Sequence, residues 1–159
     1  MSRLFITPRH LQTIERHAAI SYPEECCGVL IGRCQSGATF VERVLSVGNE
    51  RDDSRHNRYL ISPETVLAAH KEARALGLDV IGYYHSHPDH PARPSDFDRE
   101  NAWAEVSYLI VSVAQRKVVD TRSWRLSNDQ EGFEEEVIDQ AAIGSYPVTG
   151  TPGVHKEAV

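Results

Sequence analysis

Short apolar runs bounded by turn-forming residues constrain this chain most. They cover residues 26–31, 40–47, 79–87 and 108–113. Runs of this length, rich in Val, Ile, Leu and Tyr, are typical of buried strands and are too short for buried helices. Ser36-Gly37 separates the first two runs, which predicts a hairpin. Residues 118–126 are expected to pair with the fourth run, so the chain is expected to contain a sheet.

Three helices are expected between these strands. Thr7-Pro8 and Ser62-Pro63 each combine an N-cap hydroxyl with a proline in the first helical turn, which predicts helices from residue 8 to about 19 and from 63 to 76. Ser95 is expected to begin a short third helix that reaches about residue 103. Hairpins and helical crossovers occur together, so the sequence predicts an α/β fold with a mixed β-sheet flanked by helices.

The chain is long enough for one domain, and we expect that domain to cover residues 1–140 and a flexible tail to cover 141–159. The formal charge of −6 disfavours a nucleic-acid partner. No apolar window is long enough to span a membrane, and no signal peptide is recognisable. The three cysteines, Cys26, Cys27 and Cys34, do not form a disulfide pattern, which favours the cytoplasm.

The segment from His85 to Asp98 carries the chemistry. His85 and His87 are two residues apart on an expected strand, so their imidazoles point to the same face. Asp98 follows after a loop long enough to bring a carboxylate back to them. Two imidazoles and one carboxylate suit zinc, and three protein ligands leave a fourth position open for water. This pattern predicts a catalytic metal site.

Each of these residues also has a simpler interpretation. A bare His-x-His pair is more often a packing or surface feature than a metal site. Ser95-x-x-Asp98 is by itself a capping box, and a carboxylate that binds metal is less available to cap a helix. His90 is a competing ligand in the proline-rich loop. Cys26 and Cys27 are interpreted as small buried residues.

A zinc hydrolase also needs a general base, and Glu25 and Glu24 are both candidates before the first strand. The residues alone do not choose between them.

The order of these residues, Glu25 followed by His85-Ser86-His87-Pro88, six residues, Ser95, two residues and Asp98, resembles the JAMM (MPN+) metalloprotease motif at every position. Residues 22–28, Gly82-Tyr83-Tyr84 and Ser123-Trp124-Arg125 are also similar to the compact prokaryotic members, and the similarity extends over residues 3–137.

The resemblance implies a cytidine-deaminase-like JAMM/MPN fold and one Zn²⁺ per chain on His85, His87 and Asp98. It implies that Glu25 is the catalytic base and that Ser95 stabilises the oxyanion. The implied substrate is a ubiquitin-like or sulfur-carrier protein, cut at a peptide or isopeptide bond after its C-terminal diglycine, with release of cysteine or trimming of extra residues.

Three alternatives stay open or are disfavoured at this level. A catalytically silent MPN interaction module and a zinc peptidase for small peptides stay open. A zinc deaminase is disfavoured because its Pro-Cys-x-x-Cys element is absent from the sequence. The acidic segment 131–136 is expected to be a solvated face, with a contact for a basic partner as the alternative.

Overall fold

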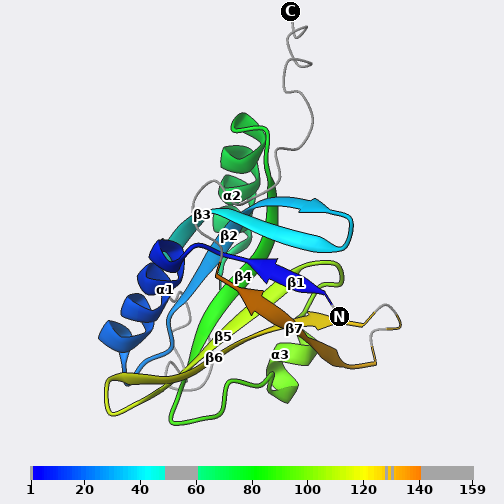
Figure 1. Cartoon of the computed structure of the whole chain (residues 1–159). Coiled ribbons are helices and arrows are strands. Elements are labelled where there is room, and N and C mark those ends of the chain that lie inside the picture. Colours follow the sequence, from blue (N-terminus) through cyan, green and yellow to red (C-terminus); the bar gives the residue numbers. More distant parts are fainter. Residues whose placement is uncertain (1, 49–60, 128, 130, 141–159) are drawn as a thin grey trace, which may run out of the picture.

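The computed structural model describes residues 2–48, 61–127, 129 and 131–140, and the expected tail at 141–159 lies outside these residues. Three helices and seven strands are seen in the described part of the chain (Figure 1). In chain order they are β1 (Arg3–Phe5), α1 (Pro8–Ser21), β2 (Cys27–Gln35), β3 (Ala38–Val47), α2 (Pro63–Ala75), β4 (Asp79–Pro88), α3 (Asp96–Glu100), β5 (Ser107–Ala114), β6 (Lys117–Leu126) and β7 (Phe133–Asp139).

The strands form one mixed sheet in the order β1-β3-β2-β4-β5-β6-β7. β4 pairs antiparallel with β2 and parallel with β5, so it lies in the middle of the sheet. β1 pairs parallel with both β3 and β7, and the sheet therefore closes on itself. This mixed sheet with flanking helices confirms the predicted fold class.

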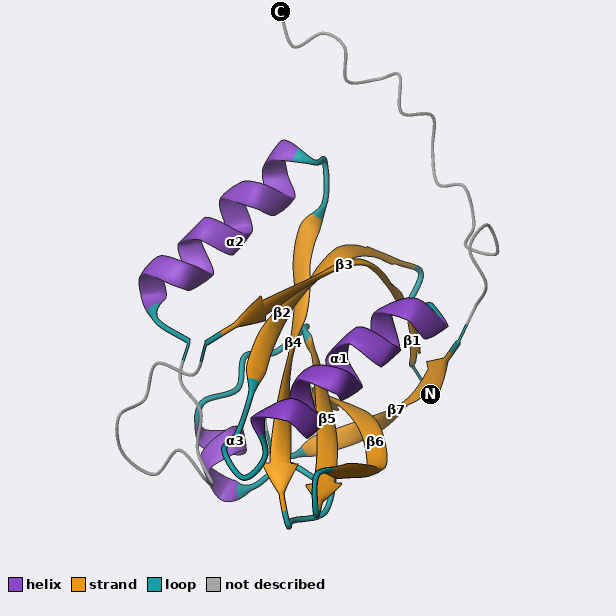
Figure 2. Ribbon diagram, turned by 90° about the vertical axis from the view of Figure 1, so that its left-hand side faces the viewer, coloured by secondary structure: helices purple, strands orange, loops and turns teal. Residues whose placement is uncertain are grey.

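Apolar side chains of the central strands alternate between two separate cores. Leu30, Ile81 and Tyr84 pack in the core that α1 covers, whereas Val29 and Tyr83 pack in the core that α2 covers. Successive strand residues point to opposite faces, so strands buried on both faces appear as continuous apolar runs. Figure 2 shows α1 crossing the central strands and α2 lying beside the upper part of β4. The two layers explain why the apolar runs lack polar alternation.

The helix starts follow the predicted caps. The Thr7 hydroxyl accepts a hydrogen bond from the His10 N–H at 3.2 Å, and the Ser62 hydroxyl accepts one from the Thr65 N–H at 3.2 Å. α2 ends earlier than predicted, at Ala75, and Leu76 forms its C-cap with 43 % of its surface exposed rather than joining the apolar face. α3 is also shorter than predicted and ends at Glu100.

The prediction that the first strand ends at residue 31, just before Gly32, was wrong. β2 continues through it to Gln35, and the register with β3 shifts between Ile31 and Gly32. A Cβ at residue 32 would lie 1.8 Å from the Phe40 carbonyl oxygen, so the close approach of two strands at a bulge requires glycine. The predicted hairpin at Ser36-Gly37 is confirmed, with both residues at positive φ.

Strands β1 and β7 were not predicted, and the interpretation of residues 131–136 as a solvated face was wrong in part. Glu134 and Glu135 are exposed, but Glu136 is 2 % exposed. Its carboxylate accepts hydrogen bonds from the Ser123 hydroxyl at 2.6 Å and from the Ser2 hydroxyl at 3.2 Å. The pairing of β7 with β6 turns this carboxylate inward, where the hydroxyls offset the cost of its burial.

Cys26 and Cys27 are buried as predicted and Cys34 is exposed, and none of these three described cysteines forms a disulfide. Among the helices of the described residues, none has the length and apolar character needed to cross a membrane.

Candidate metal centre

Two histidines from the central strand form one side of the site. His85 and His87 lie on the same face of β4, as their spacing predicts, with 0 % and 6 % of their surfaces exposed. Their Nε2 atoms are 3.1 Å apart and their ring centroids 4.9 Å apart. Two ring nitrogens thus face a shared point close to the end of β4.

Asp98 completes the group from α3. One carboxylate oxygen, Oδ1, lies 3.2 Å from His85 Nε2, and the other, Oδ2, lies 3.1 Å from His87 Nε2. One donor atom from each of the three residues lies within 4.8 Å of the others, so this group could hold a metal ion. The loop of residues 88–95 returns the chain to the strand end, as the spacing in the sequence predicts.

The capping box at α3 is present together with this arrangement. The Ser95 N–H donates to Asp98 Oδ2 at 2.8 Å, and the Asp98 N–H donates to the Ser95 hydroxyl at 3.1 Å. A carboxylate offers several lone pairs, so Asp98 can cap the helix and face both imidazoles. In this geometry the Asp98 carboxylate can cap α3 and still face the two imidazoles, so capping does not prevent metal binding.

The other nitrogen of His87 is held by the backbone. His87 Nδ1 lies 2.8 Å from the Pro91 carbonyl oxygen, and because a carbonyl only accepts, Nδ1 carries the proton. In the neutral ring Nε2 then presents its lone pair to the cluster, as ligating histidines generally do.

The loop that carries Pro91 is itself anchored to the sheet. The Trp124 Nε1–H donates to the Ala92 carbonyl at 3.0 Å, the Ser112 hydroxyl donates to the His90 carbonyl, and the Asp89 N–H donates to the Val113 carbonyl at 2.7 Å. This role of Trp124 could not be predicted from the sequence, because no pattern links it to Ala92, which lies 32 residues earlier in the chain.

The shifted pKa values of Asp98 and His85 suit the binding of a cation. Burial alone would raise the pKa of Asp98, but the adjacent His85, the nearby His87 and the hydrogen bond from the Ser95 N–H hold that pKa well below its usual range. Burial outweighs the nearby carboxylate at His85 and lowers the pKa of its imidazole. An ionised carboxylate and neutral imidazoles are the forms that bind metal. The donor set therefore fits a divalent ion such as zinc.

Glu25 and Ser95 line a pocket beside this cluster. The pocket has a volume of about 390 Å³ and is lined by Glu25, His87, His90, Pro91, Arg93, Pro94 and Ser95. Glu25 is buried and Glu24 is exposed, so the structure separates two candidates that the residues alone left equivalent. His90 is exposed, with its ring 6.5 Å from that of His87, and it is not part of the converging group.

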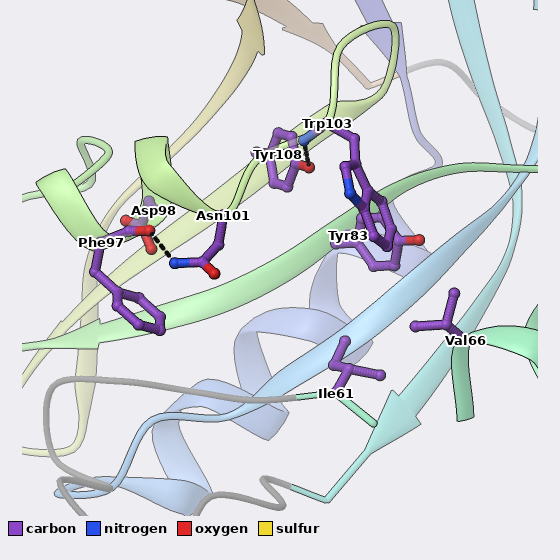
Figure 3. Close-up of a pocket in the computed structure, with 8 residues that line it drawn as sticks. All are labelled: Ile61, Val66, Tyr83, Phe97, Asp98, Asn101, Trp103 and Tyr108. Carbon is purple, nitrogen blue, oxygen red and sulfur yellow. Dashed lines mark hydrogen bonds between the residues drawn. The ribbon is translucent and has the colours of Figure 1, made fainter. Parts of the chain in front are cut away.

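Asp98 also lines a second pocket (Figure 3). Its volume is about 210 Å³, and it is lined by Ile61, Val66, Tyr83, Phe97, Asp98, Asn101, Trp103 and Tyr108. Trp103 is half exposed, and its ring meets that of Tyr83 edge-on at 5.6 Å. Aromatic rings from β4, β5 and the segment after α3 thus form an apolar wall beside the cluster. The residues of this pocket share no periodic pattern, so the pocket could not be predicted from the sequence.

Comparisons with known proteins agree on the family. Residues 7–127 match the family model described as prokaryotic homologues of the JAB domain. A desampylase of Haloferax volcanii is 36 % identical over 70 % of this chain and 81 % of its own length. A probable TtuB-protein conjugate cleaving protease of Thermus thermophilus is 34 % identical over 67 % of this chain and 68 % of its own length.

Solved structures show the same similarity. The solution structure of a protein from Desulfitobacterium hafniense has a TM-score of 0.74 and 34 % identity, and the match covers 89 % of this chain and 94 % of that one. A JAB1/MPN domain protein from Archaeoglobus fulgidus, at 18 % identity and a TM-score of 0.50, shares the fold over 89 % of this chain and 97 % of its own. This chain therefore belongs to the JAMM/MPN family of hydrolases, in the group described as prokaryotic homologues of the JAB domain.

Proposed function

We propose that this chain is a zinc-dependent metallopeptidase that hydrolyses the peptide or isopeptide bond after the C-terminal diglycine of a ubiquitin-like or sulfur-carrier protein. The observation that carries the proposal is the convergence of His85, His87 and Asp98 within 4.8 Å, directly beside the pocket that contains Glu25. A buried carboxylate next to a three-residue donor set is the arrangement expected of a hydrolytic metal site.

Zinc is the proposed ion, with one per chain held by His85 Nε2, His87 Nε2 and the Asp98 carboxylate. When bound, zinc supplies Lewis acidity that polarises a carbonyl and lowers the pKa of water. Three protein ligands leave room for a substrate or a water molecule, unlike the closed four-ligand sets of structural sites.

Glu25 is the proposed proton carrier. It accepts one proton of the attacking water, whose oxygen forms the new bond to the carbonyl carbon. It then delivers that proton to the amine nitrogen as the carbon–nitrogen bond breaks, so the products are a carboxylic acid and an amine. Its burial in the pocket that His87 and Ser95 also line supports this role.

Ser95 is proposed to stabilise the oxyanion. Its hydroxyl oxygen accepts the Asp98 N–H at 3.1 Å, which uses a lone pair and keeps the O–H proton for the substrate oxygen. A fixed donor of this kind contributes about 3 kcal/mol to stabilisation of the transition state.

The diglycine preference follows from the depth of the site. Both histidines are buried at the end of a central strand, so the scissile bond must come close to the protein surface around them to reach the site. Glycine has no side chain and permits such an approach. The aromatic pocket beyond Asp98 suits apolar residues that precede the diglycine (Figure 3). The relatives named as a desampylase and as a conjugate cleaving protease support a substrate of this class.

Two further proposals concern the whole chain. The catalytic domain is proposed to end near residue 140, after β7 closes the sheet, with residues 141–159 outside it. The proposed location is the cytoplasm, because the three cysteines of the described residues form no disulfide.

The first test is metal content combined with turnover. Protein purified without added metal is expected to hold one zinc per chain, and His87→Ala is expected to hold far less. A panel of diglycine-tailed carrier proteins with C-terminal extensions, followed by mass spectrometry, is expected to show cleavage after the second glycine. Glu25→Gln is expected to keep its zinc and lose turnover, whereas the matched Glu24→Gln variant keeps both.

Three outcomes would contradict the proposal. Full turnover by Glu25→Gln removes the assigned base. Faster cleavage of dipeptides than of carrier tails favours the small-peptide peptidase. Zinc-loaded protein that binds the carriers and cleaves nothing favours the silent interaction module.

A further inference from the structure

We propose that Arg93 forms a subsite for the free α-carboxylate of the departing fragment, which makes trimming of C-terminal residues the preferred reaction over cleavage of lysine-linked conjugates. This inference rests on the proposed function and specifies the substrate class that the function leaves open.

The position of Arg93 in the site assigns it to the leaving side. Arg93 lines the same pocket of about 390 Å³ as Glu25, His87 and Ser95. Glu25 must reach the nitrogen of the departing amine, so the pocket that contains Glu25 receives the amine side of the substrate. The aromatic pocket, which Asp98 also lines, shares no residue with this one and is left for the acyl side.

The backbone of Arg93 is held at a defined place. Ala92 is buried, and its carbonyl accepts the Trp124 Nε1–H at 3.0 Å. The Arg93 N–H donates to the Pro91 carbonyl at 2.8 Å, and Pro94 restricts the backbone of the residue before it. A long side chain that starts from such a rigid point loses less freedom on binding than one on a loose loop.

The guanidinium is available to a ligand. Arg93 is exposed, and within the part of the chain that the structure describes no carboxylate lies within ion-pairing distance of it. By contrast, the nearby Arg99 pairs with Asp96 at 3.2 Å. The planar guanidinium donates two parallel hydrogen bonds to a carboxylate, which suits a chain terminus better than an amide.

The two leaving groups differ in the charge that they present close to the scissile bond. When one residue leaves, its free α-carboxylate lies about one residue length, ~3.8 Å, beyond the scissile bond. When a lysine side chain leaves, the nitrogen is followed by four methylene groups, and the lysine α-carboxyl is part of an amide within the conjugated protein. Only the first leaving group presents an anion inside the pocket.

Three labelled peptides test this inference, all with the same residues up to the diglycine. The first ends in Gly-Gly-Ala with a free carboxylate, the second is its carboxamide, and the third joins the diglycine to the Nζ of a lysine amide. The zinc-loaded protein is expected to cleave the carboxylate peptide with a kcat/KM about 10-fold above the other two, as a charged hydrogen bond at a partly exposed site provides.

The variants locate the effect. Arg93→Gln is expected to lose the preference and Arg93→Lys to restore part of it, while Arg9→Gln, at the distant start of α1, keeps it. Zinc content is measured for every variant. Fluorescence anisotropy measures the binding of the three peptides to Glu25→Gln and so reports the preference without turnover.

Each outcome separates the inference from the proposed function. Equal cleavage of carboxylate and carboxamide overturns the Arg93 subsite and leaves the peptidase intact. A preference that persists in Arg93→Gln overturns it as well. Tighter binding of the carboxylate peptide without any cleavage supports the subsite and refutes the peptidase. Neither cleavage nor a binding preference refutes both.

Discussion

Substitutions at Asp98 separate its capping role from its proposed metal-binding role. Asp98 Oδ2 accepts the Ser95 N–H at 2.8 Å, while the two carboxylate oxygens lie 3.1 and 3.2 Å from the two histidine Nε2 atoms. An asparagine keeps one oxygen for the cap and loses the negative charge. An alanine loses the cap acceptor as well. The two variants therefore change stability and metal affinity in different proportions.

The structure sets the expected magnitudes. In metal-free protein Asp98→Ala removes the partner of a helix N–H and the anion beside two buried imidazoles, and such losses cost ~2–3 kcal/mol of unfolding free energy. Asp98→Asn keeps the cap, so its cost is expected to stay within ~1 kcal/mol. Zinc affinity is expected to fall at least ~100-fold in both variants, since changing even the hydrogen-bond partners of metal ligands costs 10–100-fold.

Two measurements check these values. Urea denaturation in the presence of a chelator gives the stability of the metal-free protein, and competition with a chromophoric chelator gives the zinc affinity. Ser95→Ala is the matched control, because it removes the other half of the capping box at ~1 kcal/mol and leaves the three proposed ligands in place. If Asp98→Asn binds zinc as tightly as the unmodified protein, then capping is the only role of Asp98 and the proposed ligand set is wrong.

Three further predictions concern the surroundings of the site. Gly28→Ala would place a Cβ 2.0 Å from a ring carbon of the fully buried Tyr84, so we expect a loss of ~2–3 kcal/mol in urea denaturation, whereas alanine at Gly48, which has nothing within 4 Å, should cost much less. Trp124→Phe removes the donor to the Ala92 carbonyl and should cost ~1 kcal/mol of stability and up to ~10-fold in zinc affinity by chelator competition. Burial raises the pKa of the Cys26 thiol from 9.0 to about 11, so the unfolded chain loses this proton at a lower pH than the folded chain. The contribution of Cys26 to the free energy of unfolding is therefore complete below about pH 9. It falls by up to ~1.4 kcal/mol per pH unit as the pH rises toward 11. Cys26→Ala should lack this component, and denaturation at about pH 8 and about pH 10 would contradict the reasoning if both proteins lost equal stability.

Local signals in the sequence account for much of the fold. The hydroxyl caps at Thr7 and Ser62 predicted where α1 and α2 begin, because a cap depends on residues only three positions apart. The two-residue spacing of His85 and His87 predicted a shared face for the same reason. Contacts that depend on a few adjacent residues can be predicted from a single chain.

Pairings between distant segments could not be predicted in this way. β1 has three residues and is held by β3 and β7, which lie far along the chain. Glu136 looks like part of an acidic surface until Ser123 and Ser2 are placed against it. Glu25 and Glu24 differ only in burial, and burial is a property of the folded chain. These features became visible only when the sheet was assembled.

Asp98 combines both kinds of information in one residue. Its backbone and carboxylate are held by Ser95 through a local cap made of protein atoms alone. The two histidines are held by the register of β4 against β2 and β5. A ligand set positioned by the fold itself loses little freedom when an ion binds, so metal affinity and metal-free stability should vary independently among variants. A proportional loss of both across Ser95→Ala, Asp98→Asn and Asp98→Ala would instead mean that the ion assembles the site.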